Sequence, residues 1–396
     1  MYPNLYYAFK DLFGRDDWTF LRFVNSFGFF VALAFIGAAI VLSLELKRKE
    51  REGLLLYKEE LVVVGKPATL AELIVNFILG FLLGYKILGL FFTGSDEAVN
   101  PQAFLFSTQG NLPLGLILGL FFAGLKYWEK NKQKLAKPEE RKIRIWPHDR
   151  VGDITMYAAV FGFLGAKLFD ILESPQDFMQ SIRDVQHGAQ DAASLIFSGL
   201  TFYGGLICAA LAIWYYAKKN NIGFWQLNDA AAPALMLAYA MGRIGCQVAG
   251  DGDWGIPNTS PKPFHWLPDW MWAFNYPHNV INKGIGIPGC IGQFCSQLPE
   301  PVYPTPFYET VVCLILFFLI WSIRKRFTLP GTLFAIYLTL NGLERFFIEK
   351  IRVNVQYAIF GFHPTQAEII SSLLVIGGVL LYFFLKTKHR AAGLKA

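Results

Sequence analysis

The sequence LAYAMGRIGCQVAGDGDWG, from Leu237 to Gly255, joins an apolar helix to a turn rich in glycine and aspartate. Arg243 lies within the apolar part, inside a membrane or at its rim. A charged side chain at that depth is costly, so it usually marks a pathway or a functional site. Gly242 and Gly245 remove side-chain bulk beside the arginine, which lets another helix or a lipid headgroup approach. The alternative is a glycine packing motif whose arginine extends to the interface.

Apolar stretches of about 20 residues recur on both sides of this motif, and that length crosses a bilayer. The chain has 396 residues, of which 54% are hydrophobic and 37 are phenylalanine. We therefore expect an all-α, polytopic transmembrane protein. The net charge of +6 does not indicate nucleic-acid binding, because the basic residues cluster in alternate loops. No cleavable signal peptide is expected, since residues 1–18 lack a basic segment that leads into a short apolar core.

Hydropathy predicts about nine membrane spans, which places the two termini on opposite sides. Polar residues from Ser107 to Asn111 separate the second span from the third. The predicted spans cover residues 24–45, 69–93, 108–126, 152–172, 197–216, 229–249, 308–323, 331–348 and 366–385.

Lysine and arginine residues predict the orientation, because 24 of them fall on one side of these spans and eight on the other. The positive-inside rule then puts the N-terminus outside and the C-terminus in the cytoplasm. Residues 1–22 become an external stretch at the interface, and residues 250–306 a Trp-rich external head segment. Cys290 and Cys295 lie in this head, on the oxidising side, where they either form a disulfide or remain free thiols.

A phenol and a carboxylate enter the predicted membrane near its outer face. Tyr203 precedes Gly204 and Gly205 at the outer end of the fifth span, so its phenol is expected to face open space. An ordinary interfacial tyrosine is the alternative. Glu309 follows the sequence YPTPFY, just inside the seventh span.

Two arginines on separate spans, Arg243 and Arg345, are candidates for a phosphate clamp. Arg345, Glu349 and Arg352 are spaced by four and then three residues, so one helix face would hold them and Glu349 could pair with both arginines. A structural ion-pair ladder at the membrane rim is the alternative. The sequence has no Gly-rich nucleotide loop, no metal-type spacing of His and Cys, and no Ser-His-Asp order.

Five motifs together resemble the prolipoprotein diacylglyceryl transferases. GRIGCQVAGDGDWG is the most specific, and YGGLI, YPTPFYE, ERFFIEKIR and TQAE stand in the family's order at comparable spacing. The resemblance runs from about Asp149 to the C-terminus, with a weaker likeness from Asn25 to Gly28. It implies a seven-span core, made of the first span and six spans in a catalytic membrane core over residues 149–396. Residues 23–148 would hold the first span, an inserted hairpin of two spans and a basic cytoplasmic loop.

The resemblance also implies a reaction in the bacterial cytoplasmic (inner) membrane, with the active site toward the outer leaflet. The diacylglyceryl group of phosphatidylglycerol would pass to the lipobox cysteine of prolipoproteins, whose signal peptides the Trp-rich segment would present. No metal or other cofactor is needed. Arg243 and Arg345 would bind the phosphate and Glu349 would orient Arg345. The implied thiol proton acceptors are Tyr203, Glu309 and Asp251, and the implied lipid-binding glycines are Gly204, Gly205 and Gly255.

Several positions depart from the family pattern. Tyr203 stands where many members have histidine, and phenol has a pKa of about 10 against about 6.5 for imidazole, so the thiol base remains open. Ala249 replaces a usual asparagine, Tyr303 and Pro306 replace a histidine and a glutamine, and Glu368 replaces a glutamine. These departures keep a non-catalytic lipid-binding relative as one alternative. A transporter or channel is another, although the sequence does not contain the paired broken helices of two inverted halves.

Overall fold

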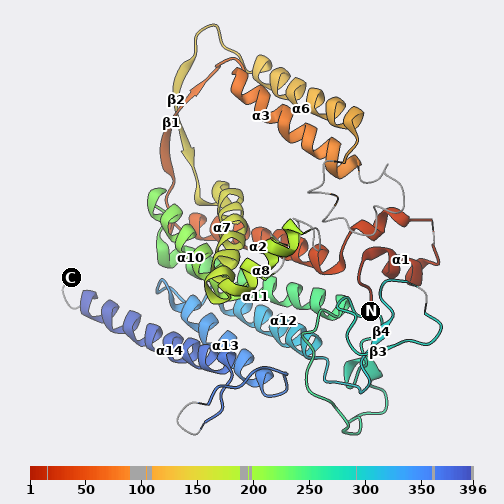
Figure 1. Cartoon of the computed structure of the whole chain (residues 1–396). Coiled ribbons are helices and arrows are strands. Elements are labelled where there is room, and N and C mark those ends of the chain that lie inside the picture. The colour runs from red at the N-terminus through yellow and green to blue at the C-terminus, as the bar shows by residue number, and fades with distance from the viewer. Residues whose placement is uncertain are drawn as a thin grey trace. The chain divides into compact units, whose positions relative to one another are not determined.

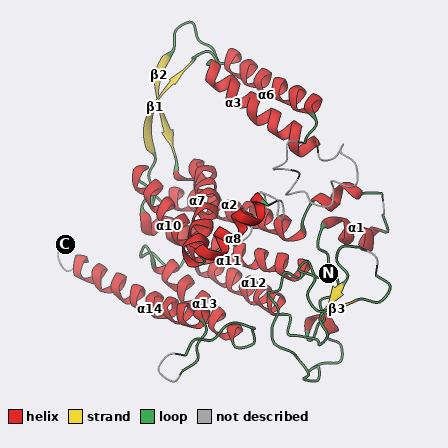
Figure 2. Cartoon of the chain, in the orientation of Figure 1, coloured by secondary structure: helices red, strands yellow, loops and turns green. Residues whose placement is uncertain are grey.

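The computed structural model describes residues 1–15, 17–89, 104, 109–187, 195, 199–290, 292–358 and 362–393. Helices dominate this part of the chain (Figure 2), which confirms the predicted all-α class. Contacts divide the chain into two compact units, one of Met1–Leu56 with Ile222–Ala396 and one of Tyr57–Asn221. The division at residues 22 and 148 that the sequence suggested stays a prediction.

The first unit is built around α11 (Phe224–Ala249), which packs against α2, α12 and α13, while α13 packs along α14 (Figure 1). Fully buried alanines along α11, among them Ala230, Ala232 and Ala240, let these neighbours approach closely. The other helices of this unit are α1 (Leu5–Phe13), α2 (Ser26–Arg51), α12 (Thr305–Ile323), α13 (Thr332–Glu349) and α14 (Gln366–Gly393), with 3-10 helices at Thr19–Phe23 and Asp269–Met271.

The end of α11 determines where the motif turn begins. Gly250 has a φ of 66° and its N–H donates to the Cys246 carbonyl at 3.0 Å. A glycine suits this left-handed position because it has no Cβ to clash with the backbone. The helix therefore stops at Ala249, and the chain turns so that Asp251 and Asp253 follow it directly.

The second unit contains two pairs of helices that pack closely at glycine residues, α3 with α6 and α7 with α10. A Cβ on Gly84 would lie 2.3 Å from the Leu114 carbonyl oxygen, so the two helices of the first pair are in backbone contact. Small residues allow this approach between membrane helices. The helices are α3 (Leu70–Leu82) with a π-helical extension (Leu83–Leu88), α6 (Leu112–Lys132), a 3-10 turn (Pro147–Arg150), α7 (Val151–Glu173), α8 (Pro175–Gln186) and α10 (Phe202–Lys219).

An antiparallel ribbon joins the two basic segments on either side of the α3–α6 pair. Its strands are β1 (Lys58–Val64) and β2 (Glu139–Ile145), with Lys58 opposite Ile145 and Val64 opposite Glu139 (Figure 1). These two segments pair with each other, so both ends of the predicted inserted hairpin are held together. Their predicted location in the cytoplasm stays a prediction.

Each of the nine predicted spans coincides with a helix in the described part of the chain; residues 90–93, 108 and 197–198 of these predictions lie outside it. By length and composition, six helices in the described residues can cross a membrane, which makes the protein a multi-pass membrane protein. They cover Ser26–Arg51, Leu70–Leu88, Leu112–Lys132, Pro147–Glu173, Thr305–Ile323 and Gln366–Lys388. The other three predicted spans coincide with α10, α11 and α13. Of these helices, α11 and α13 carry the charged residues described below. The number of spans stays a prediction.

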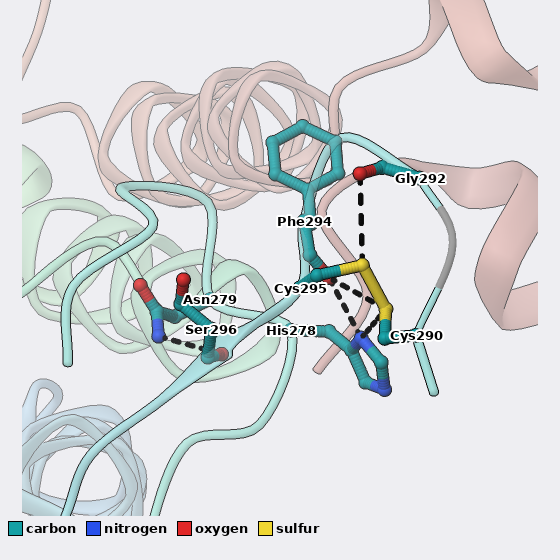
Figure 3. Close-up of a disulfide and its surroundings, with 7 residues drawn as sticks. All are labelled: His278, Asn279, Cys290, Gly292, Phe294, Cys295 and Ser296. Atoms are coloured by element: carbon teal, nitrogen blue, oxygen red, sulfur yellow. Dashed lines mark hydrogen bonds between the residues drawn. A yellow bond between two sulfur atoms is a disulfide. The ribbon is translucent and has the colours of Figure 1, made fainter. Parts of the chain in front are cut away.

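A disulfide links the two cysteines of the head segment, which the sequence had left as either bonded or free thiols. Cys290 and Cys295 are bonded, with their Cα atoms 5.6 Å apart (Figure 3). The His278 Nδ1 lies 2.7 Å from the Phe294 carbonyl oxygen beside this bond. The strands β3 (Ile285–Gly286) and β4 (Ser296–Gln297) pair next to it.

The tryptophans of the head do not form one surface. Trp254 is buried with Tyr276, Leu298 and Val302 in a small core. Trp266, in contrast, is 77% exposed and stacks on Phe264. Of these two tryptophans in the predicted external head, only Trp266 is therefore available to contact lipid headgroups.

Candidate active site

Three arginines of the first unit meet around one buried carboxylate. Glu309, in α12, is fully buried. Its Oε2 is 2.8 Å from Arg243 Nε, and its Oε1 is 3.0 Å from Arg345 Nη1 and 3.4 Å from Arg352 Nη1. The Tyr239 hydroxyl donates to the same Oε1 at 3.3 Å. Charge-assisted bonds of this kind hold the guanidinium groups in a fixed arrangement.

Asp253 forms a second bridge on the more exposed side of this cluster. Its Oδ1 is 2.6 Å from Arg352 Nη2, and its Oδ2 forms an ion pair with Arg243. Burial alone would raise the pKa of the Asp253 carboxyl, but the two guanidinium charges outweigh burial and hold the pKa below its ordinary value. The Thr305 hydroxyl donates to the Asp253 carbonyl oxygen at 2.6 Å, which anchors the turn to the start of α12.

Gly255 allows the turn to lie directly on the segment that carries Arg352. The two residues form an antiparallel bridge, and the N–H of Ile256 donates to the Ile351 carbonyl at 2.9 Å. A Cβ on Gly255 would lie 2.5 Å from that carbonyl oxygen, so only glycine fits. This close approach explains the glycine, while its predicted contact with the lipid stays a prediction.

Asp251 lies in the same turn, beside Cys246. Its Oδ1 accepts the Asp253 N–H at 3.3 Å, and burial raises the pKa of its carboxyl above the ordinary value. Ligand atoms of Cys246, Asp251 and Asp253 lie within 4.8 Å of one another and could hold a metal ion. Arg243 already occupies this place, however, because it pairs with Asp253 and its Nη1 is 3.8 Å from the Cys246 Sγ. A cation would have to displace the guanidinium.

Glu349 has only one of the two arginine partners expected of it. Its Oε2 is 3.0 Å from Arg345 Nη2, as predicted. The prediction that it also pairs with Arg352 is wrong, because α13 ends at Glu349 and the helical spacing does not continue. Arg352 turns to Asp253 and Glu309 instead. The other oxygen of Glu349 accepts the Thr365 hydroxyl at 2.8 Å.

The predicted residues of the YGGLI motif lie in the second unit, at the start of α10. Tyr203 is half-buried and its ring stands edge-on to Phe202. A Cβ on Gly204 would lie 2.7 Å from the Gly165 carbonyl oxygen, and one on Gly205 would lie 2.8 Å from that of Gly162. Helix packing against α7 therefore accounts for both glycines. Their contact with lipid, and the part of Tyr203 in thiol activation, stay predictions.

Three further residues of the first unit lie at this cluster and are not among the residues predicted from the sequence. Tyr239 stands one helical turn before Arg243, and Asp253 lies within the signature turn itself, so helical spacing and the motif could have suggested both. Glu344 precedes Arg345 and is buried, and its two carboxylate oxygens have no hydrogen-bond partner among the described residues.

Comparison with known proteins identifies the family of the chain that carries this cluster. A family model described as prolipoprotein diacylglyceryl transferase matches residues 113–384, which include every site residue named above. Three similar proteins are named phosphatidylglycerol--prolipoprotein diacylglyceryl transferase. The one from Thermus thermophilus is 32% identical over 192 residues, or 47% of this chain and 63% of that protein. The one from Leifsonia xyli subsp. xyli is 28% identical over 232 residues, or 58% and 64%.

The third similar protein, from Corynebacterium glutamicum, is 28% identical over 285 residues, or 71% of this chain and 82% of that protein. The chain thus spans less than two thirds of the first two relatives and most of the third. The family model itself covers more than half of the chain, including α6, α7 and α10 to α13. The chain therefore belongs to the prolipoprotein diacylglyceryl transferase family.

Proposed function

We propose that this protein transfers the diacylglyceryl group of phosphatidylglycerol to the lipobox cysteine of prolipoproteins. The cysteine sulfur attacks the glyceryl carbon and forms a thioether, the bond from that carbon to the phosphate oxygen breaks, and glycerol phosphate leaves. The thiol proton passes to an acceptor on the protein. The observation that carries the proposal is the group of three arginines around Glu309, in a chain of this family.

The arginines suit the leaving group. Negative charge grows on the phosphate oxygen as the carbon–oxygen bond breaks, and guanidinium groups placed beforehand stabilise that charge. Arg243 and Arg345 share Glu309 as a partner, so they reach the same small region from two different helices. Glu349 holds the second nitrogen of Arg345 and keeps its orientation.

The candidates for the thiol proton acceptor differ in their surroundings. Glu309 is fully buried and both its oxygens contact guanidinium groups, which suits an organising residue better than a base. Asp251 is half-buried with a raised pKa, so its basicity is closer to that needed near neutral pH. Tyr203 is a candidate because the resemblance of the YGGLI motif implies that it stands where many members of the family have histidine.

The lipid is proposed to enter sideways from the bilayer. A groove of about 500 Å³ runs between the end of α13 and α14, with largely apolar walls that include Phe346, Ile369 and Leu373. Phe346 and Lys350 of this groove are the chain neighbours of Arg345 and Glu349. Acyl chains could therefore lie in the groove while the phosphate reaches the arginines.

The protein is proposed to lie in the bacterial inner membrane with its N-terminus outside and its C-terminus in the cytoplasm, since 24 basic residues fall on one side and eight on the other. The head segment and the arginine cluster then face the outer leaflet, where signal peptides of prolipoproteins arrive. The Trp-rich head is the proposed contact for these peptides. Labelling of single cysteines in residues 126–151 by an impermeant thiol reagent in spheroplasts would contradict this orientation.

The reaction is tested with purified protein in detergent micelles, phosphatidylglycerol and a peptide that contains a lipobox cysteine. We expect the peptide mass to rise by one diacylglyceryl group, with one glycerol phosphate released per thioether. A Cys→Ser peptide is the control and should remain unmodified. Binding of phosphatidylglycerol without peptide modification would instead identify a non-catalytic relative, and ion or solute flux in liposomes would identify a transporter.

A further inference from the structure

The charges of the arginine cluster are balanced before any substrate arrives. Three guanidinium groups, those of Arg243, Arg345 and Arg352, face three carboxylates. These carboxylates belong to Glu309, Glu349 and Asp253, and each arginine contacts at least one of them. A phosphate that binds here adds a negative charge, and both terminal nitrogens of Arg352 already contact Asp253 and Glu309. Release of one carboxylate would keep the charge balanced and make donors available to the phosphate.

Exposure and anchoring indicate which carboxylate moves. The side chains of Glu309 and Glu349 are fully buried on α12 and α13. The Asp253 side chain is 36% exposed, and it lies in an irregular turn after Gly252, whose φ of 103° few other residues adopt. A buried carboxylate that leaves its partners pays the full cost of an unpaired charge, whereas Asp253 can turn into water.

We propose that Asp253 occupies the phosphate position of this site and that the phospholipid binds by displacing it. The two Asp253 oxygens contact one arginine each, Arg352 through Oδ1 and Arg243 through Oδ2. The two non-bridging oxygens of a phosphodiester can make the same two contacts, because guanidinium groups accept carboxylate and phosphate with similar geometry. Arg352 thereby becomes a phosphate ligand beside Arg243.

The exchange preserves the balance of charge at the site, since one anion replaces another. It also keeps the arginines ordered while the site is empty, because no guanidinium is left unpaired in an apolar environment. The identification of the anion as phosphatidylglycerol rests on the proposed function. Asp253 then sets how tightly the site binds this lipid, because the lipid has to compete with it.

The test compares lipid binding by the wild-type protein and the Asp253→Asn variant, with a short-chain phosphatidylglycerol as the probe. Asparagine keeps the shape of the side chain and removes the competing charge, so the Kd should fall about tenfold, which corresponds to about 1.4 kcal/mol. The matched control is Asp269→Asn in the same head segment. Asp269 pairs with Lys262 at the surface, so its replacement should leave the Kd unchanged.

Thermal unfolding gives a second measurement on the same variants. Without lipid, Asp253→Asn should unfold at a lower temperature than the wild type, because Arg243 and Arg352 lose a shared partner. Added phosphatidylglycerol should raise its midpoint by more than it raises that of the wild type. Glycerol phosphate, added in place of the lipid, separates the two sources of phosphate. An equal gain from glycerol phosphate would assign the site to free phosphate esters and overturn the lipid part of the proposal.

Two outcomes would overturn the displacement itself. The first is an unchanged or weaker affinity of the folded Asp253→Asn variant for phosphatidylglycerol. The second adds Arg352→Lys to the Asp253→Asn variant, in which the competing carboxylate is gone; lysine keeps the charge but loses the planar two-point contact. If the phosphate takes over the Arg352 contact, binding should weaken about tenfold relative to Asp253→Asn alone, and an unchanged Kd would contradict the proposal. These measurements concern lipid binding alone, so a failure of the proposed reaction would be seen separately, as wild-type protein that does not modify the peptide.

Discussion

In the first unit the motif residues meet through charged side chains, whereas in the second unit the motif glycines meet a neighbouring helix through their backbones. Arg243, Arg345 and Glu309 come from three helices and contact one another directly. Gly204 and Gly205 of α10 instead lie against the backbone of α7. The residues of these motifs therefore serve a charged cluster in one unit and helix packing in the other. Substitutions in the two units should separate these roles, because they affect activity and stability in different proportions.

The largest effect is expected at the centre of the charged cluster. Glu309→Gln removes the shared partner of three guanidinium groups and should destabilise the protein by about 3–5 kcal/mol, the range for breaking a buried ion pair. The measurement is the thermal unfolding midpoint in detergent micelles. Lipid transfer should be lost together with the fold.

Glu344→Gln is the matched control for Glu309→Gln, since it makes the same change at another buried glutamate. Glu344 has no hydrogen-bond partner among the described residues, so an amide there should change stability by less than about 1 kcal/mol. Equal losses at the two positions would show that burial, not the arginine partners, determines the effect.

The second largest effect concerns the thiol base and compares the two units directly. Removal of a general base should lower turnover roughly a hundredfold or more. Burial raises the pKa of Asp251, and a base works only when ionised, so activity through Asp251 should rise with pH on an acid limb above the ordinary value of about 3.9. Asp251→Asn would remove that limb. A Tyr203 base would instead give activity that rises toward alkaline pH, as phenolate forms.

The pH profiles of Asp251→Asn and Tyr203→Phe therefore show whether the thiol base is Asp251 of the first unit or Tyr203 of the second. Tyr203→Phe keeps the ring and removes only the hydroxyl. Unaltered turnover and pH dependence in this variant would remove Tyr203 from the mechanism. A smaller loss, mostly in KM and with the wild-type profile, would indicate that the hydroxyl only positions the lipid.

An intermediate loss of turnover is expected when Arg243, one of the proposed phosphate ligands, is replaced. Charge-assisted bonds contribute roughly 1.5–3 kcal/mol, so Arg243→Ala should lower turnover by about ten- to a hundredfold. Arg243→Lys should restore only part of the activity, because lysine lacks the planar fork. Peptide lipidation by the folded variants is the measurement. Wild-type turnover in Arg243→Ala would exclude this arginine from phosphate binding.

The smallest effect on turnover is expected from a substitution of Gly204, which packs against α7. A Cβ on Gly204 would lie 2.3 Å from the Phe169 Cβ, so Gly204→Ala should cost about 1–3 kcal/mol of stability through overpacking. Gly152→Ala on α7 is the control, because open space surrounds that glycine. Turnover per folded molecule should change little. A raised KM for phosphatidylglycerol with unchanged stability would instead support direct contact of Gly204 with the lipid.

The sequence alone determined the helices and most of the cluster's members. An apolar run of membrane-spanning length forms a helix because its backbone polar groups must be satisfied within the segment, so local composition is sufficient. The same reasoning identified Arg243, Arg345 and Glu309 as costly charges in apolar company. It also found the Arg345–Glu349 pair, because both residues lie on one helix and their spacing fixes their distance.

Only the tertiary structure decided which charges meet across helices. Glu309 gathers three arginines, and Asp253 reaches Arg352 from a turn 99 residues away in the chain. Helical spacing does not predict the partners of Arg352, because α13 ends at Glu349. The β1–β2 ribbon and the Cys290–Cys295 disulfide likewise depend on where a second segment of the chain lies. Helix formation is a local property of the chain, whereas an ion pair depends on where two side chains end, and this is determined by the packing of all the elements between them.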